Sequence, residues 1–178
     1  QVFGQTTFTA STAATSSTGM KAPAAICTET GFVPPFATII QRLWVADTGN
    51  SRVLRFETPL NSANGAAASG VLGQSAFTSS TAALSSTGMS EPSGLAAEPN
   101  GRLWVADRAF KRVLRFDAAG TKANGAAASG VLLQVNFFGS GYDRTPGQLT
   151  VSPQGRLFVP IVNENRVLWF NSAGTTAN

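Results

Sequence analysis

One sequence pattern occurs three times along the chain. The string RLWVAD, followed a few residues later by RVLRF, spans residues 42–56 and again residues 102–116. A weaker third copy, RLFV followed by RVLWF, spans residues 156–170. Self-similarity at a period of about 60 residues is typical of repeat architectures, in which each unit buries its faces against a copy of itself. The repeat therefore predicts the fold more directly than any single residue does.

Each unit is expected to contain four short antiparallel strands. In the middle unit these strands cover residues 71–74, 94–98, 102–107 and 112–116. The turn Pro99-Asn100-Gly101 separates the second from the third, because proline fixes one dihedral angle and Asn-Gly tolerates positive φ. The pattern has no amphipathic period of 3.6 residues, which argues against helical repeats. A β-propeller blade accounts for four antiparallel strands in a unit of this length.

The repeated segments resemble NHL repeats, long-period bacterial ones in particular. The resemblance rests on GLAAEPNGRLWVADRAFKRVLRFD, RLWVADTGNSRVLRF and QLTVSPQGRLFVPIVNENRVLWF. It implies an all-β propeller of four-stranded antiparallel blades, about three per chain, forming one domain over residues 1–178. The strand-permuted units would cover approximately residues 1–56, 71–116 and 131–170. The irregular segment 21–41 contains no copy of GLAAE, and residues 36–40 (FATII) are its best substitute.

The order of the strands predicts how the propeller closes. Residues 2–5 resemble the last strand of a blade, whereas residues 166–170 resemble the third strand. Three blades are too few for a ring and would expose apolar edges. We therefore expect a six-bladed ring made by a homodimer, in which each chain lends its first strand to the other. The alternative is that this chain is a piece of a longer protein.

Composition narrows the chemistry that this chain can perform. The 178 residues include one cysteine and no histidine, so an intrachain disulfide and every histidine-based metal site or catalytic triad are excluded. The net charge of +4 is ordinary for a soluble protein, and we do not expect nucleic-acid binding. No apolar run is long enough to cross a membrane. The abundance of Ser, Thr and Ala favours a secreted or periplasmic protein, and we expect no cofactor.

The hairpin turns carry charged residues at a constant spacing. Asp47 and Arg52 are five positions apart, and Asp107 and Arg112 repeat that spacing. A carboxylate and a guanidinium there can pair across the turn. The resemblance to NHL blades implies that these pairs are structural fasteners.

The third unit departs from this pattern because Ile161 stands where the aspartate should be. Arg166 is then left to contact Glu164, solvent or a ligand. The aromatic residues Trp44 and Trp104 are expected to pack between neighbouring blades rather than to stack on a sugar, and Trp169 is interpreted in the same way.

We expect a non-catalytic binding or scaffold module for a protein or glycan, with the loops 6–18, 76–90 and 137–147 on its binding face. The alternatives are a propeller-type metal-dependent hydrolase or lactonase and a lectin-like carbohydrate-binding propeller. No residue is assigned a catalytic, cofactor or metal-binding role. The candidate ligand surface consists of residues in loops or turns: Phe110, Lys111, Tyr142, Asp143, Arg144 and Arg166.

Overall fold

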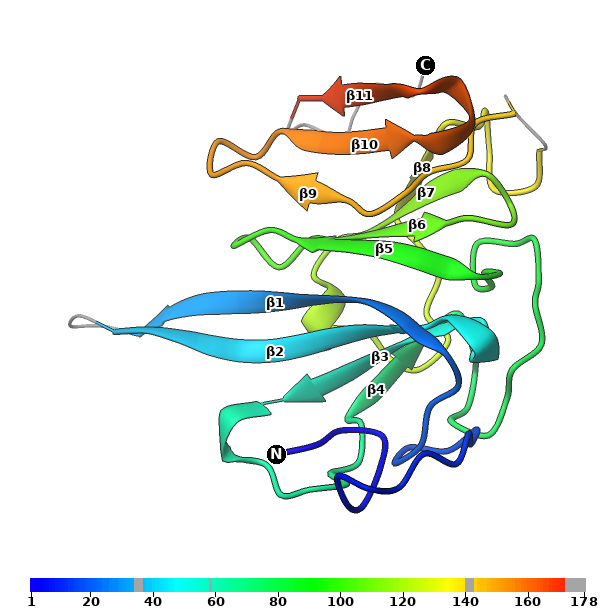
Figure 1. The fold of residues 1–178 in the computed structure, drawn as a ribbon. Helices are drawn as coiled ribbons and strands as arrows, with labels where there is room; N and C mark the ends of the chain where they lie inside the picture. The colour runs from blue at the N-terminus through cyan, green and yellow to red at the C-terminus, as the bar shows by residue number, and fades with distance from the viewer. Residues whose placement is uncertain (34–36, 58, 140–142, 172–178) are drawn as a thin grey trace.

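The protein is all-β and consists of three antiparallel sheets arranged in series (Figure 1). The computed structural model describes residues 1–33, 37–57, 59–139 and 143–171. Sheet 1 contains β1 (Pro23–Val33), β2 (Ala37–Asp47), β3 (Arg52–Glu57) and β4 (Gly70–Leu72). Sheet 2 contains β5 (Pro92–Ala97), β6 (Leu103–Asp107), β7 (Arg112–Phe116) and β8 (Gly130–Leu132). Sheet 3 contains β9 (Thr150–Val151), β10 (Leu157–Ile161) and β11 (Arg166–Phe170). The predicted all-β class with successive antiparallel sheets is confirmed.

Short 3-10 helices connect several strands of the three sheets. They are η1 (Thr48–Asn50), η2 (Pro59–Asn61), η3 (Ala119–Thr121) and η4 (Val162–Glu164). Within the described parts of the chain, no helix is long and apolar enough to span a lipid bilayer.

The sequence repeat is reproduced as a repeat of strand register. In sheet 1, β3 pairs with β4 through Val53 opposite Leu72. In sheet 2, β7 pairs with β8 through Val113 opposite Leu132. Equal register places equivalent side chains on the same face of each sheet, because side chains alternate between the two faces of a strand. The sheets can therefore be compared position by position.

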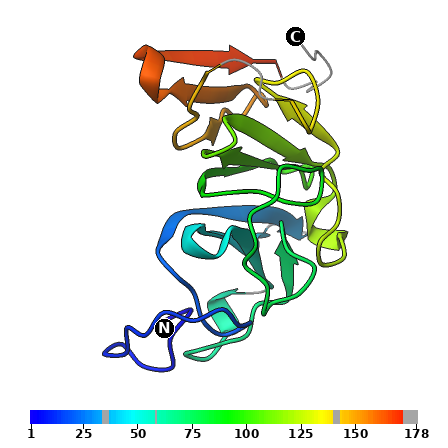
Figure 2. The same cartoon turned by 90° about the vertical axis from the view of Figure 1, so that its right-hand side faces the viewer.

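The core lies between successive sheets, and the repeated tryptophans fill it. Trp44 is 1% exposed and packs with Leu95 and Val105, which bridges sheets 1 and 2. Trp104 is equally buried and packs with Leu149, which bridges sheets 2 and 3. Large aromatic side chains contribute most to such a core because each buries a large apolar area. The second view shows the three sheets following one another along the molecule (Figure 2).

The irregular segment of the first unit is a lengthened hairpin, not a remodelled strand. The first strand of sheet 1 is β1, whereas residues 37–40 of the expected substitute belong to β2 and pair back onto β1. Phe36 lies outside the described residues. A bulge between Glu29 and Thr30 marks the point where the regular sheet ends and the hairpin extension begins. The prediction for residues 36–40 was wrong because the insertion lengthened the turn and left the strand intact.

One expectation fails at the edge of the third sheet. Trp169 does not pack between sheets; it is 56% exposed, and the guanidinium of Arg156 lies 5.2 Å from its ring centroid. The cause is that β11 is the outermost described strand of sheet 3. Residues 2–5 form no strand within this chain, and their expected pairing with a second copy stays a prediction.

Candidate binding surface

Sheets 1 and 2 each contain one buried ion pair, which joins the two middle strands of that sheet. Arg52 Nε lies 2.6 Å from Asp47 Oδ2, and Arg112 Nε lies 2.7 Å from Asp107 Oδ2. All four side chains are 0% exposed, so no ligand can reach them. Burial raises the pKa of Asp107 to about 6, although Arg112 and the N–H of Ser90 act in the opposite direction. These residues act inside the protein rather than on its surface.

The same two arginines also fasten the loops at this end of the sheets. Arg112 Nη2 donates a hydrogen bond to the carbonyl oxygen of Gly88 at 2.9 Å, and Nη1 donates to that of Phe137 at 2.6 Å. Gly88 precedes β5 and Phe137 follows β8, so one guanidinium holds the loops on both sides of sheet 2. Arg52 makes the equivalent bonds at sheet 1.

The two long loops anchored in this way share one fold. In the loop before β5, residues 73–88, Gln74 Nε2 donates to the carbonyl oxygen of Thr81 at 2.9 Å. In the loop before β1, Gln5 Nε2 donates to the carbonyl oxygen of Thr12 at the same distance. Because the bonds recur, this loop fold is a property of the repeat and not of one unit.

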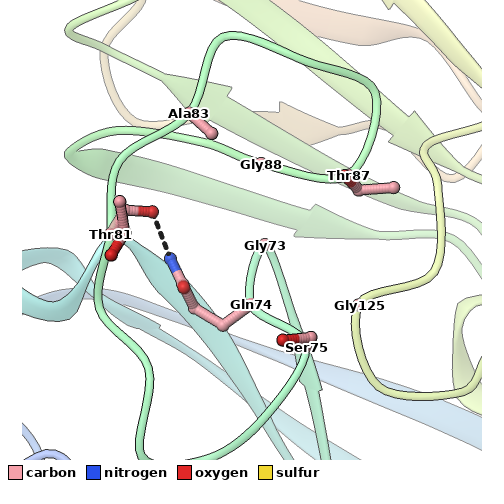
Figure 3. A pocket seen from close by; sticks show the side chains of 8 residues that line it. All are labelled: Gly73, Gln74, Ser75, Thr81, Ala83, Thr87, Gly88 and Gly125. Atoms are coloured by element: carbon pink, nitrogen blue, oxygen red, sulfur yellow. Dashed lines mark hydrogen bonds between the residues drawn. The ribbon is translucent and has the colours of Figure 1, made fainter.

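A pocket of about 290 Å³ opens beside the loop of residues 73–88. Its lining residues are mostly small, and none carries a charge or an aromatic ring: Gly73, Gln74, Ser75, Thr81, Ala83, Thr87, Gly88 and Gly125. Figure 3 shows the amide of Gln74 directed at Thr81, with Ser75 and Thr87 on other sides of the opening. Hydroxyl groups both donate and accept hydrogen bonds, so this lining suits a neutral polar group.

Glycine is required at two places in this pocket. A Cβ atom on Gly88 would lie 2.4 Å from the carbonyl oxygen of Ala83, which cannot move without shifting the backbone. Gly73 has φ +86°, and a Cβ there would lie 2.7 Å from the side chain of Met89. The pocket wall therefore depends on close approach of the backbone.

The predicted ligand residues do not come together in a single site. Lys111 and Asp143 form an ion pair at 2.5 Å with side chains 46% and 76% exposed. Phe110 lies under the guanidinium of Arg112, which is 5.5 Å from the ring centroid. The Lys111–Asp143 pair connects the β6–β7 turn to the loop before β9, and none of these residues lines the pocket.

A second group of those residues surrounds one carboxylate. Arg166 and Arg144 both form ion pairs with Glu164, the latter at 3.4 Å. Arg166 thus takes Glu164 as its partner in place of the aspartate that is missing from this unit. Tyr142 lies outside the described residues.

Sequence reasoning missed two buried glutamates that organise the cores of sheets 1 and 2. Trp104 Nε1 donates to Glu98 at 2.6 Å, and Trp44 Nε1 donates to Glu29 at 3.1 Å. Arg42 also pairs with Glu29 at 2.8 Å. The signal was present, because Glu29 and Glu98 each lie six positions after a proline and an arginine precedes both tryptophans by two positions. The hairpin extension obscured the match.

The single cysteine lies beside a groove between the first strands of the sheets. This groove, about 320 Å³ in volume, is lined by residues of β1, β5 and the segment around β9, including Cys27 and Gln148. Burial, with a smaller effect of Glu29, raises the pKa of the Cys27 thiol to about 12. The thiol is therefore protonated at neutral pH and is a weak nucleophile.

Comparisons with known proteins leave the family open. No protein-family model matches the chain. No curated protein matches it either. Among solved structures, a chain of Kuenenia stuttgartiensis hydrazine synthase is similar with a TM-score of 0.44 and 10% sequence identity. The match covers 79% of this chain and spans only 34% of that chain.

Proposed function

We propose that this protein is a non-catalytic protein-binding module that holds a peptide segment of its partner in the pocket beside residues 73–88. The observation that carries the proposal is the lining of that pocket, which offers hydroxyl, amide and backbone groups without any charge. An extended peptide presents backbone N–H and C=O groups that need neutral hydrogen-bond partners of this kind. A small-residue lining also lets a peptide backbone approach closely.

The positions of the acidic residues favour binding over catalysis. Eight of the nine acidic side chains take part in ion pairs with lysine or arginine: Glu29, Asp47, Glu57, Glu98, Asp107, Asp117, Asp143 and Glu164. A general base or a metal ligand needs a carboxylate that is available to the reacting group. Pairing with a cation stabilises the charged form. Burial nevertheless raises the pKa of Asp107, but this carboxylate is 0% exposed and out of reach of a substrate.

The tryptophans favour a protein partner over a glycan. Sugar recognition commonly uses exposed aromatic faces, which stack on pyranose rings. Trp44 and Trp104 are each only 1% exposed, and their indole N–H groups are bound to buried glutamates. These two tryptophans are thus committed to the core.

The same proposal includes the architecture of a β-propeller built from NHL-like repeats, in which each sheet is a blade. The equal registers of sheets 1 and 2 and the contact of their first strands along one groove support it. Three sheets would form half of a six-bladed ring, and a second copy of the chain would supply the other half.

A peptide-display library panned against the full chain tests the proposed activity. We expect enriched peptides to bind the wild-type protein and to lose binding when the pocket is filled by Ser75→Leu with Thr87→Leu. Ser80→Leu, at an exposed residue of the same loop that does not line the pocket, is the matched control and should leave binding unchanged. Failure to enrich any peptide, or equal binding by the filled variant, would refute the proposal. Selective hits on a glycan array would replace the peptide with a sugar.

A further inference from the structure

The loop before β1 repeats the residues that line the pocket beside residues 73–88. Alignment of GQTTFTASTAATSSTG (residues 4–19) with GQSAFTSSTAALSSTG (73–88) gives an equivalent for seven of the eight lining residues. The eighth, Gly125, corresponds to Gly65 of the preceding unit. Seven of the eight pairs are identical, and the remaining pair has Thr6 in place of Ser75, which keeps the hydroxyl group. The chain therefore carries this set of neutral polar and small residues twice.

The close approach of a distant backbone segment is repeated as well. A Cβ atom on Gly125 would lie 2.9 Å from Ser75 Cα, and one on Gly65 would lie 3.2 Å from Thr6 Cα. Both glycines have positive φ, +68° and +70°, so the turn that reaches the loop has the same backbone conformation in both units.

The far end of each loop is held by an equivalent hydrogen bond. Ala128 N donates to the carbonyl oxygen of Ser86 at 2.8 Å, and Ala68 N donates to that of Ser17 at 2.8 Å. Together with the bonds of the two glutamines to threonine carbonyls, these contacts show that the repeat copies the arrangement of the residues and not only their order.

One buried side chain joins the two loops. Arg52 Nη2 donates to the carbonyl oxygens of Ser16 at 2.9 Å and Gly19 at 3.0 Å, and its Nη1 donates to that of Phe77. Both loops therefore lie at the same end of the sheets, where a single partner can contact them together. We propose that residues 4–19 with Gly65 form a second peptide-binding site, which holds another segment of the same partner. This inference rests on the proposed function and adds a site to it.

The residue that follows the conserved alanine differs between the two sites. Leu84 follows Ala83 and is 37% exposed, whereas Thr15 follows Ala14 and its hydroxyl donates to Asn50 Oδ1 at 2.8 Å. An apolar neighbour favours an apolar peptide side chain, and a hydroxyl favours a polar one. Because apolar burial adds to affinity, peptides enriched on the wild type should be those of the pocket beside residues 73–88.

The third unit does not repeat the site. Leu133 stands where the other units have glycine, and Val135 stands where they have a hydroxyl residue. Gln134 keeps its place in the sequence, but its Nε2 donates to the carbonyl oxygen of Phe110 in the β6–β7 turn. We therefore expect two sites per chain.

Panning of the peptide library against the pocket-filled variant, Ser75→Leu with Thr87→Leu, isolates the second site. We expect enriched peptides with more Ser, Thr and Asn than those from the wild type. A synthetic copy of the most enriched one should bind at least about 10-fold more weakly once Thr6→Leu and Thr18→Leu are added. Ser11→Leu, at an exposed residue that corresponds to the control position Ser80, should leave binding unchanged.

The variant Thr6→Leu with Thr18→Leu also carries its own test of folding. In an otherwise wild-type chain it should bind the peptides of the first pocket with unchanged affinity. Enrichment on the wild type but not on the pocket-filled variant would refute the second site and leave the proposed function intact. Binding that Thr6→Leu with Thr18→Leu does not weaken would place the peptide elsewhere and refute the second site too. Enrichment on neither protein would refute both.

A linked peptide tests whether one partner spans both sites. One peptide of each class is joined through Gly-Ser linkers of about 5 to 40 residues and titrated into the full chain. At one or more linker lengths we expect binding at least about 10-fold tighter than that of the tighter peptide alone, and loss of this gain when either site is filled. No gain at any length would overturn the claim of a shared partner.

Discussion

The buried arginine of sheet 2 is the side chain on which this structure depends most. Arg112 is 0% exposed and donates to Asp107, Gly88 and Phe137 at 2.6–2.9 Å. Arg112→Met fills a similar volume but removes all three bonds. It also leaves the carboxylate of Asp107 buried without its cation.

The expected cost follows from the burial of this pair. Loss of one partner of a buried ion pair costs about 3–5 kcal/mol, mostly because the remaining charge has no compensation. The bond to the carbonyl group of Gly88 is buried and that to Phe137 is partly buried, so the loss of these bonds adds to the cost. We therefore expect Arg112→Met to lower the free energy of unfolding by at least about 4 kcal/mol, a large part of the stability of an ordinary domain.

Urea unfolding, followed by tryptophan fluorescence and circular dichroism, measures this change. The third unit provides the matched control: Arg166 is 49% exposed, and Arg166→Met should cost no more than about 1 kcal/mol.

A double-mutant cycle tests the reasoning most strictly. Asp107→Leu combined with Arg112→Met should be less destabilising than the sum of the single changes by at least about 2 kcal/mol, since neither charge is then buried alone. If Arg112→Met does not fold, Arg112→Lys keeps the charge and loses the fork of donors, and it should be intermediate. A cost below about 1 kcal/mol for Arg112→Met, or an additive double mutant, would refute the account.

Three further predictions concern the core, the pocket and the thiol. Glu98→Leu should destabilise the protein in urea unfolding by about 2 kcal/mol, because it leaves the buried N–H of Trp104 without an acceptor, and Glu98→Gln should cost less. Gly88→Val should lower the free energy of unfolding by about 1–3 kcal/mol and weaken peptide binding. Gly139→Val is the control, because the nearest atom to a Cβ there is 3.4 Å away, and it should change neither quantity. Cys27 should react with a thiol reagent at pH 8 far more slowly than it does in urea. Because its folded pKa of about 12 exceeds the ordinary 9.0, stability relative to Cys27→Ala should be full below pH 9 and fall as the pH rises from about 9 to 12. Equal reaction rates in the folded and unfolded protein would contradict this.

The fold was predictable wherever the repeat is intact. The expected strands 102–107 and 112–116 agree with β6 and β7 to within one residue. The spacing of Asp107 and Arg112 also predicted a pair across the turn, and they lie opposite each other in the register. Such features depend on local sequence and on the neighbouring strand, which the repeat supplies.

The remaining errors arise where structure depends on something outside the local sequence. The hairpin extension hid the match between Glu29 and Glu98, because nine additional residues separate Glu29 from its arginine. Trp169 is exposed because no sheet lies beside β11 among the described residues, and the sequence around it carries no sign of that. Half of the residues that line the pocket lie in the expected loop 76–90, but the sequence does not show that Gly125 of a distant segment closes the pocket. Function as a binding module, the NHL resemblance and secretion stay predictions.

A crystal structure of the full chain would test most directly whether the three sheets are blades of a ring that a second copy completes. The account predicts two chains with six sheets around one axis. Sheets of one chain that close no ring with a second copy, or sheets that continue from copy to copy in a straight row, would contradict it.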